Sequence, residues 1–449
     1  MTGSLPVELA VLKKLHFIDF NRNIIQGSIP TEYESLSQVH FFDVRHNQIT
    51  GSIPDWMGNA WNNLGELALS FNNMTGTLPE SLHNLTHIKT LTLAHNSFDS
   101  DLAPIQGLKT LEFLYLEDNQ FRGTVDGTFL AEMPNLVQVD ISSNKLDGQG
   151  LPLHLLQHPT LKVLDLCDNN MNGTFPQMTS TNPVLRYLSL CDNALTGSLP
   201  KTISKLDKLT HLDLSNNDLT GEIPSSLAAM QFLTYLFLSE NAFGKGPIPE
   251  FLSAMDHLRE LSLAATQRTG SLPAAWLDLL DPLVLLDLSR NELTGTLPSQ
   301  LWELPHLEYL FLNRNQLTGD FPSGLSSPTI NHTSNLQVLV LDKNNITGTL
   351  TDVCLDKGND STVSHAIKTV IADCSDSSKE IVCDCCVCCS DEDASCNDEI
   401  WGLNLGFDWE QNYTRVAFAF SPQLLKQGHA TASQHGRRNL AAPTKARMS

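Results

Sequence analysis

Residues 206–224 decide the fold, and they read Leu206-Asp-Lys-Leu209-Thr-His-Leu212-Asp-Leu214-Ser-Asn-Asn217-Asp-Leu219-Thr-Gly221-Glu-Ile223-Pro224. The pattern is L-x-x-L-x-x-L-x-L-x-x-N-x-L-x-G-x-[IL]-P, and its return at a fixed period predicts a repeat array. Fourteen repeats follow one another at intervals of 23 to 25 residues, except for a longer step from Asn315 to Asn344. Their Asn slot holds Asn23, Asn47, Asn72, Asn96, Asn119, Asn144, Asn169, Asn193, Asn217, Asn241, Thr266, Asn291, Asn315 and Asn344.

Each position of the pattern has a physical role. The L-x-L pair has the period of two that is typical of a short strand with one buried face. Stacked repeats are expected to form parallel strands about 4.8 Å apart, because a single repeat cannot bury its own apolar ends. The Asn amide can satisfy backbone groups that the turn after the strand leaves buried. The sequence therefore predicts one elongated solenoid.

Composition and charge exclude several classes of function. The chain of 449 residues has 28 Lys plus Arg against 50 Asp plus Glu, a formal charge of −22. All the acids lie in residues 1–410, whereas residues 411–449 carry six bases and no acid. An acidic array disfavours nucleic acid and anionic membranes as partners. The chain contains no run of about 18 apolar residues, so the sequence predicts no membrane span.

No catalytic motif is found. Kinase, P-loop and H-E-x-x-H signatures are missing, so we expect neither enzymatic activity nor a cofactor.

The repeat resembles the plant-type leucine-rich repeat of receptor-kinase ectodomains and of secreted inhibitors of wall-degrading enzymes. The resemblance covers residues 1–350 and implies an α/β solenoid, a superhelix whose concave parallel sheet carries a ligand-binding inner surface. Departures are local: repeats 4 and 5 lack the Pro, and repeats 6 and 10 carry one extra residue. The chain begins in the second half of a repeat, which leaves apolar surface exposed, so we expect an incomplete N-terminus that lacks a cap and a signal peptide.

The C-terminal part is predicted to differ from the array. Residues 351–420 are a Cys-rich cap region, and residues 421–449 are a basic, disordered tail. Disulfides fit an even number of cysteines after a repeat array. A thiolate metal cluster is the alternative, because C-x-C-C-x-C-C is also a metallothionein-like spacing. The region resembles the Cys-rich cap of microalgal leucine-rich-repeat proteins, and its cysteines are Cys354, Cys374, Cys383, Cys385, Cys386, Cys388, Cys389 and Cys396.

Two further cysteines and a set of sequons remain open. Cys167 and Cys191 occupy equivalent slots in consecutive repeats, where a tight disulfide and two free thiols are equally compatible with the sequence. Sequons are weak signals in a chain this rich in Asn. Asn73 and Asn345 each follow a ladder Asn and are expected to face solvent. Candidate glycosylation sites are Asn73, Asn84, Asn172, Asn331, Asn345, Asn359 and Asn412.

The outward slots of the strands are the candidate binding surface. Six aspartates share the slot inside L-x-L, namely Asp19, Asp43, Asp140, Asp165, Asp213 and Asp287. Exposed aromatics beside polar residues favour peptide or sugar recognition, whereas a merely solvated sheet face is the alternative. The candidate ligand-binding residues are Phe113, Tyr115, Tyr187, Tyr235, Phe237, Tyr309, Phe311, Asp165, Asp213 and Asp287.

These observations favour a non-catalytic recognition module. It would bind a protein, peptide or glycan on the concave face, outside the cell or at its surface, and a membrane-anchored co-receptor is a further expected partner. Two alternatives stay open: a secreted inhibitor of wall-degrading hydrolases or wall-structural protein, and metal binding by the cysteine cluster.

Overall fold

The computed structural model describes residues 1–277, 280–321, 335–350, 369–373, 381–382 and 386–388. The chain divides into two units, Met1–Cys396 and Asn397–Ser449. The second unit, with the predicted basic tail, lies outside the described residues, and so does most of the predicted cap region. The boundaries expected at residues 350 and 420 stay predictions.

The first unit is built on one parallel sheet, the inner sheet, whose strands succeed one another in chain order. Fourteen of its strands come from the fourteen repeats and two from the Cys-rich segment, so among the described residues the sheet does not end at Leu350. The strands are β2 (Phe17–Asp19), β4 (Phe41–Asp43), β6 (Glu66–Ala68), β8 (Thr90–Thr92), β10 (Phe113–Tyr115), β12 (Gln138–Asp140), β14 (Val163–Asp165), β16 (Tyr187–Ser189), β18 (His211–Asp213), β20 (Tyr235–Phe237), β22 (Glu260–Ser262), β24 (Leu285–Asp287), β26 (Tyr309–Phe311), β28 (Val338–Val340), β30 (Thr369–Ala372) and β32 (Val387–Cys388).

Shorter flanking sheets form from the residues after each ladder Asn. The first contains β1 (Thr2–Ser4), β3 (Ile24–Gly27), β5 (Gln48–Gly51), β7 (Asn73–Gly76) and β9 (Ser97–Phe98). The second contains β11 (Arg122–Thr124), β13 (Lys145–Gln149), β15 (Asn170–Thr174), β17 (Ala194–Ser198) and β19 (Asp218–Thr220). The third contains β21 (Gly246–Pro247), β23 (Arg268–Gly270), β25 (Glu292–Gly295), β27 (Gln316–Asp320), β29 (Asn345–Thr349) and β31 (Ile381–Val382).

Breaks between the flanking sheets coincide with departures from the repeat pattern. The first break separates β9 from β11, in the two repeats that lack the Pro, and the second precedes β21, in the repeat with an extra residue before Ile248. The extra residue of repeat 6 causes no break: β13 still pairs with β15, and Gly150 beside this pairing takes a left-handed φ of +94°, which glycine tolerates.

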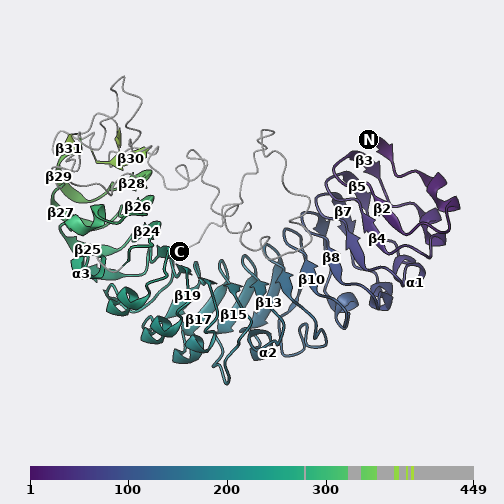
Figure 1. Ribbon diagram of the computed structural model, residues 1–449, viewed down its shortest axis with the longest axis horizontal. Coiled ribbons are helices and arrows are strands. Elements are labelled where there is room, and N and C mark those ends of the chain that lie inside the picture. The colour runs from purple at the N-terminus through teal and green to yellow at the C-terminus, as the bar shows by residue number, and fades with distance from the viewer. Residues whose placement is uncertain (278–279, 322–334, 351–368, 374–380, 383–385, 389–449) are drawn as a thin grey trace, which may run out of the picture. The chain divides into compact units, whose positions relative to one another are not determined.

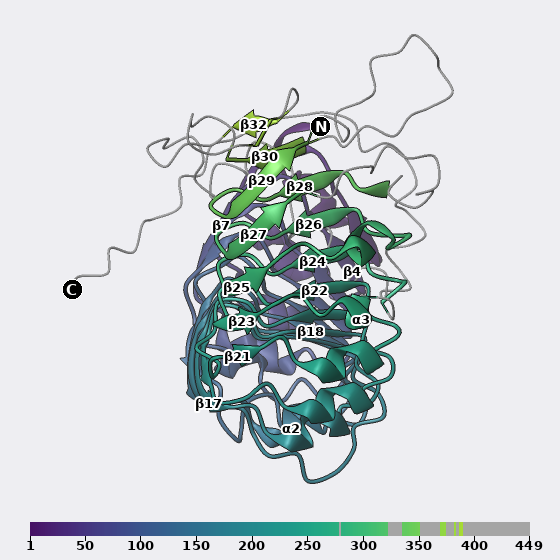
Figure 2. The ribbon, with the colours of Figure 1, turned by 90° about the vertical axis from the view of Figure 1, so that its left-hand side faces the viewer.

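Short helices connect the two kinds of strand, and most start directly after the Pro of the repeat, whose fixed φ suits a helix start. Figure 1 shows them on the outer side of the first unit, opposite the inner sheet, and Figure 2 shows the inner-sheet strands stacked like rungs. The helices are α1 (Met57–Ala60), α2 (Leu153–Leu156) and α3 (Ala274–Leu277), with the 3₁₀ helices η1 (Val7–Val11), η2 (Thr31–Ser35), η3 (Glu80–Asn84), η4 (Ala103–Ile105), η5 (Lys201–Lys205), η6 (Ser225–Ala229), η7 (Glu250–Ala254) and η8 (Ser299–Trp302).

The core lies between the inner sheet and the helices. The middle residue of each three-residue inner strand points into it, and two examples are Leu188 and Leu212, which are 0% exposed. At the N-terminal end, apolar side chains of the first repeat remain exposed as expected, with Val11 at 74% and Leu12 at 48%. In the described part of the chain, no helix has the length and hydropathy to cross a membrane.

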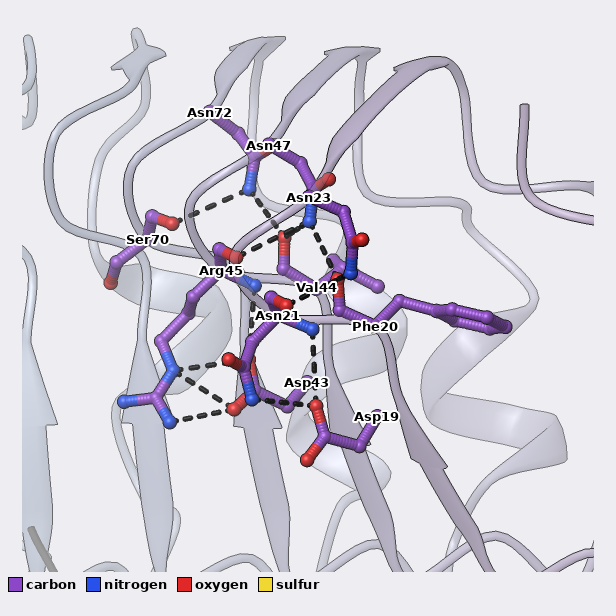
Figure 3. A network of polar contacts seen from close by, with 10 residues as sticks. All are labelled: Asp19, Phe20, Asn21, Asn23, Asp43, Val44, Arg45, Asn47, Ser70 and Asn72. Carbon is purple, nitrogen blue, oxygen red and sulfur yellow. Dashed lines mark hydrogen bonds and ion pairs between the residues drawn. The ribbon is translucent and has the colours of Figure 1, made fainter. Parts of the chain in front are cut away.

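The ladder asparagines tie each repeat to the one before it, as Figure 3 shows for the first repeats. The Nδ2 of Asn47 donates to the carbonyls of Phe20 at 2.9 Å and Val44 at 3.0 Å. Its Oδ1 accepts from the N–H of Ile25 at 2.9 Å. The predicted role of this Asn in satisfying buried backbone groups is confirmed.

In repeat 11, buried backbone carbonyls find hydrogen-bond donors without a ladder Asn. The Thr266 hydroxyl donates to the Leu263 carbonyl at 2.6 Å, which replaces one amide bond. The guanidinium of Arg268, only 4% exposed, donates to the carbonyls of Thr266, Pro247 and Gly244. A buried cation therefore pairs backbone carbonyls beside the second break in the flanking sheets.

Candidate ligand-binding surface

The surface under consideration is the face of the inner sheet that points away from the core. It is formed by the first and third residue of each strand, because the middle residue is buried. The strands pair in register, so that Tyr187 lies beside His211, and His211 beside Tyr235. All ten candidate residues lie in inner-sheet strands, as the repeat pattern predicted.

Four neighbouring strands, β14 to β20, bring half of the candidates together. We call this group the central cluster, and it consists of Asp165, Tyr187, His211, Asp213, Tyr235 and Phe237. The other candidates lie apart from it: Phe113 and Tyr115 on β10, and Asp287, Tyr309 and Phe311 on β24 and β26.

Direct contacts join the members of the central cluster. The Tyr187 hydroxyl donates to Oδ2 of Asp165 at 3.1 Å. The rings of Tyr187 and His211 stack with centroids 4.3 Å apart and planes at 16°. The His211 ring also lies 5.3 Å from Tyr235 and 5.7 Å from Phe237. Stacking holds the rings in place and covers the facing sides of Tyr187 and His211.

Burial controls the protonation of the ionisable groups in the cluster. It raises the pKa of Asp213 to about 6 and lowers the pKa of His211 to about 3, so this imidazole is neutral at physiological pH. The pKa of Asp165 is raised well above its usual range by burial and then by the charge of Asp140. Burial, followed by the charge of Asp165, raises the pKa of Tyr187 well above its usual range.

These carboxylates keep few stabilising partners. Asp213 accepts from the N–H and hydroxyl of Ser215 at 2.9 and 2.6 Å, and Asp165 accepts from the N–H of Cys167 at 3.0 Å. Among the described residues, neither carboxylate is within ion-pair distance of a cation. The cluster is therefore short of positive charge.

The expectation that all these side chains are exposed is wrong for several of them. Tyr115, Tyr187 and Phe237 are buried, at 6%, 4% and 6% exposure. Parallel strands about 4.8 Å apart leave little room between neighbouring large side chains, so rings in adjacent strands cover one another. Phe113, Tyr235, Tyr309 and Phe311 stay partly exposed.

The column of six aspartates is also less exposed than expected, since only Asp19 is freely exposed. Asp43 and Asp140 are buried at 1% and 7%, and Asp165, Asp213 and Asp287 are half-buried. Asp43 is paired with Arg45, with 2.6 Å between Oδ2 and the guanidinium (Figure 3). Asp287 accepts from the Ser289 hydroxyl at 2.7 Å, and burial raises its pKa.

Sequence reasoning missed His211, which stacks at the centre of the cluster. Its slot, the one before L-x-L, is the slot that holds Tyr187 and Tyr235 in the neighbouring repeats. An aromatic column that includes histidine would have identified it.

The cysteines are described in part. Cys167 and Cys191, left open above, form a disulfide with their Cα atoms 4.5 Å apart. Cys386 is disulfide-bonded, and the side chain of Cys388 is not described. The remaining predicted disulfide cysteines, which lie outside the described residues, are Cys354, Cys374, Cys383, Cys385, Cys389 and Cys396.

The sequons divide in the same way. Asn73, Asn172 and Asn345 are exposed, as expected for Asn73 and Asn345. Asn84 is half-buried, and its Nδ2 donates to Oδ1 of Asn59 at 2.7 Å. The sequons that lie outside the described residues are Asn331, Asn359 and Asn412.

Comparison with known families identifies the repeats over about half of the chain. A family described as a leucine-rich repeat region matches residues 141–272. A second family, described as leucine rich repeat, matches residues 256–317, and a third of the same description matches residues 38–60 and 63–85.

Three plant proteins illustrate the similarity. Receptor-like protein 39 of Arabidopsis thaliana is 31% identical over 120 residues, which are 26% of this chain and 14% of that protein. The ectodomain of the Arabidopsis thaliana receptor kinase GASSHO1/SCHENGEN3, solved in complex with CASPARIAN STRIP INTEGRITY FACTOR 2, has a TM-score of 0.70 and 29% identity, covering 85% of this chain and 46% of that chain. The plant peptide hormone receptor RGFR1, solved with RGF2, has a TM-score of 0.69 and 26% identity; the match covers 85% of this chain and 66% of that chain. The chain thus matches only a small part of the length of Receptor-like protein 39.

Proposed function

Because the chain belongs to the leucine-rich repeat family, in its plant receptor-like form, we propose that it is a non-catalytic recognition module that binds a peptide across the inner sheet. The observation that carries the proposal is the central cluster, where a partly exposed Tyr235 beside His211 lies on the same sheet face as the half-buried carboxylates of Asp165 and Asp213. The similar receptor RGFR1 is a peptide hormone receptor, which supports the same class of ligand.

The chemistry of the cluster favours a peptide over a glycan. A sugar ring binds best to the open face of an aromatic ring, but the facing sides of Tyr187 and His211 cover each other. Half-buried carboxylates without a cationic partner attract a Lys or Arg side chain or free backbone N–H groups. An extended peptide offers these groups beside apolar side chains that can contact Tyr235. We therefore expect a ligand with a basic residue next to an apolar one.

The proposal also includes the cellular setting. A receptor-like module of this kind would act outside the cell or at its surface, together with a membrane-anchored co-receptor. Phe113, Tyr309 and Phe311, which are partly exposed on β10 and β26, would extend the binding surface along the array on both sides of the cluster.

Selection from a library of displayed 12-residue peptides tests the proposal. The full chain is the target, and the variant Tyr235→Ala with Asp213→Asn is the counter-target. Enriched peptides are expected to carry Lys or Arg beside an apolar residue and to bind the variant at least ten-fold more weakly. A matched control is Phe232→Ala, which removes an aromatic ring that is 46% exposed and lies outside the inner sheet.

Binding should be unaffected by the control substitution. Failure to enrich any peptide, or enrichment of peptides that bind the counter-target equally well, would exclude peptide recognition by the central cluster. Far-UV circular dichroism of each variant verifies that the repeats remain folded.

A further inference from the structure

The disulfide between Cys167 and Cys191 lies two residues beyond the C-terminal ends of β14 and β16, which are neighbouring strands of the inner sheet. Backbone hydrogen bonds already hold the two segments together. The N–H of Leu166 donates to the Ser189 carbonyl at 3.0 Å, and the N–H of Asp168 donates to the Cys191 carbonyl at 2.9 Å. The 4.5 Å between the Cα atoms is thus imposed by the repeat. The two sulfur atoms are therefore expected to stay close together when the disulfide is reduced.

A carboxylate completes the group. Oδ2 of Asp192 lies 3.8 Å from Sγ of Cys167, and the three potential ligand atoms of Cys167, Cys191 and Asp192 lie within 4.8 Å of one another. Around a tetrahedral zinc ion, bond lengths put two sulfurs about 3.8 Å apart and a sulfur and a carboxylate oxygen about 3.5 Å apart. Small side-chain rotations would close this difference.

We propose that the reduced protein binds one thiophilic divalent cation through Cys167, Cys191 and Asp192, and that the disulfide closes this site. A dithiol reduces the bond: its two S–H groups become a new disulfide, and two cysteine thiols form. The cation then displaces the two thiol protons into solvent and takes both thiolates and the Asp192 carboxylate as ligands. Water supplies the fourth ligand of a tetrahedral site.

The orientation of Asp192 supports this role. The Nδ2 of Asn216 donates to Oδ1 of Asp192, so the carboxylate is held while Oδ2 remains directed at Cys167. Outer hydrogen bonds of this kind fix metal ligands in place. Asp192 is exposed and Cys167 is partly exposed, so an ion can enter from solvent.

The surrounding charge also favours a cation. The carboxylates of Asp168 and Glu240 add negative charge near Asp192. Negative surroundings disfavour free thiolates but favour a divalent ion that neutralises them. Soft thiolates select Zn²⁺ and similar ions over Ca²⁺ and Mg²⁺. The inference does not depend on peptide binding.

Cobalt titration of the full chain tests the site, with Co²⁺ as the probe and thiolate-to-metal absorption as the readout. The C-terminal cysteines can also bind cobalt after reduction, so the comparison is with Cys167→Ser plus Cys191→Ser, which retains them all. In the presence of a dithiol, the unchanged chain should bind one Co²⁺ more than this variant. Without reductant, the two proteins should bind equal amounts.

A second variant, Asp192→Asn, keeps both thiols and changes only an exposed side chain, so it is expected to fold. It should weaken the additional cobalt site at least ten-fold, whereas Asp168→Asn, which removes a nearby charge but no ligand, should have a smaller effect. Equal cobalt stoichiometry of the reduced unchanged chain and the double Ser variant would overturn the proposal. A difference that persists without reductant would overturn the gating by the disulfide.

Discussion

Replacement of Asp213 by Asn should stabilise the array at neutral pH and hardly at all in acid. Burial raises the pKa of Asp213 to about 6 from 3.8. The native state therefore holds this proton more tightly than the unfolded chain does. Its contribution to stability is fully present below the unfolded pKa and is lost as the pH rises through about 6. The neutral amide of the Asp213→Asn variant would carry no such penalty, and its oxygen can still accept from Ser215.

The size of the effect follows from the two pKa values. Integrating the linkage from pKa 3.8 to about 6 gives a penalty of about 3 kcal/mol at pH 7.5 and about 0.5 kcal/mol at pH 4. Asp213→Asn should raise the free energy of unfolding by these amounts. Asp218→Asn, at an exposed position of β19, is the matched control and should change stability by less than about 0.5 kcal/mol.

Urea-dependent hydrogen exchange of the segments around β16, β18 and β20 is the suitable assay, because a long repeat array need not unfold in one step. The measurement compares both variants with the unchanged chain at pH 4 and pH 7.5. An equal gain at both pH values, or no gain at pH 7.5, would refute the reasoning. If Asp213→Asn also weakens the selected peptides, the carboxylate is retained for binding at the expense of stability.

Three further outcomes are expected. Asn217→Ala removes its hydrogen bonds to four backbone groups, of which the Ser215 carbonyl keeps the N–H of Asp192 as a partner, and should lower stability by about 3 kcal/mol, measured by urea denaturation. Asn73→Ala at an exposed position should have little effect. Cys167→Ser with Cys191→Ser opens a loop of 24 residues and should cost about 3 kcal/mol without reductant, which the same denaturation measures. In a eukaryotic secretory host, site-specific mass spectrometry should find Asn73 glycosylated far more than the half-buried Asn84; equal occupancy would contradict the burial argument.

The fold could be predicted from the sequence because the same leucine and asparagine pattern recurs in each repeat. The L-x-L pair gave every inner strand from β2 to β28, and the ladder Asn gave the bonds between repeats. The strands that continue the sheet into the Cys-rich segment could not be predicted in this way, because Thr369–Ala372 and Val387–Cys388 lack the leucine spacing and the Asn. The compensation of Thr266 by Arg268 was equally hidden, since it depends on contacts between repeats.

The candidate site was predicted in position but not in environment. Slot counting placed Tyr187, Phe237 and Asp213 on the inner sheet. It could not show that Tyr187 and Phe237 are buried, because their exposure depends on the size of the side chains in neighbouring strands. The same dependence explains why His211, unremarkable within its own repeat, became the centre of the cluster. For Cys167 and Cys191, the slots established proximity but not the bond.

The interrupted flanking sheets have a consequence for where local unfolding of the array begins. The inner sheet runs without a break through all fourteen repeats, whereas the regular pairing of the flanking strands stops between β9 and β11 and again between β19 and β21. Isolated backbone bonds remain there: the N–H of Gln120 donates to the Phe98 carbonyl at 2.9 Å, and the N–H of Gly244 donates to the Gly221 carbonyl at 2.6 Å. The array thus consists of three blocks joined by the inner sheet, and at each joint the flanking row has isolated backbone bonds in place of paired strands. Fraying should start at the joints, so that one block can loosen while the others, including the one that carries the central cluster, stay intact.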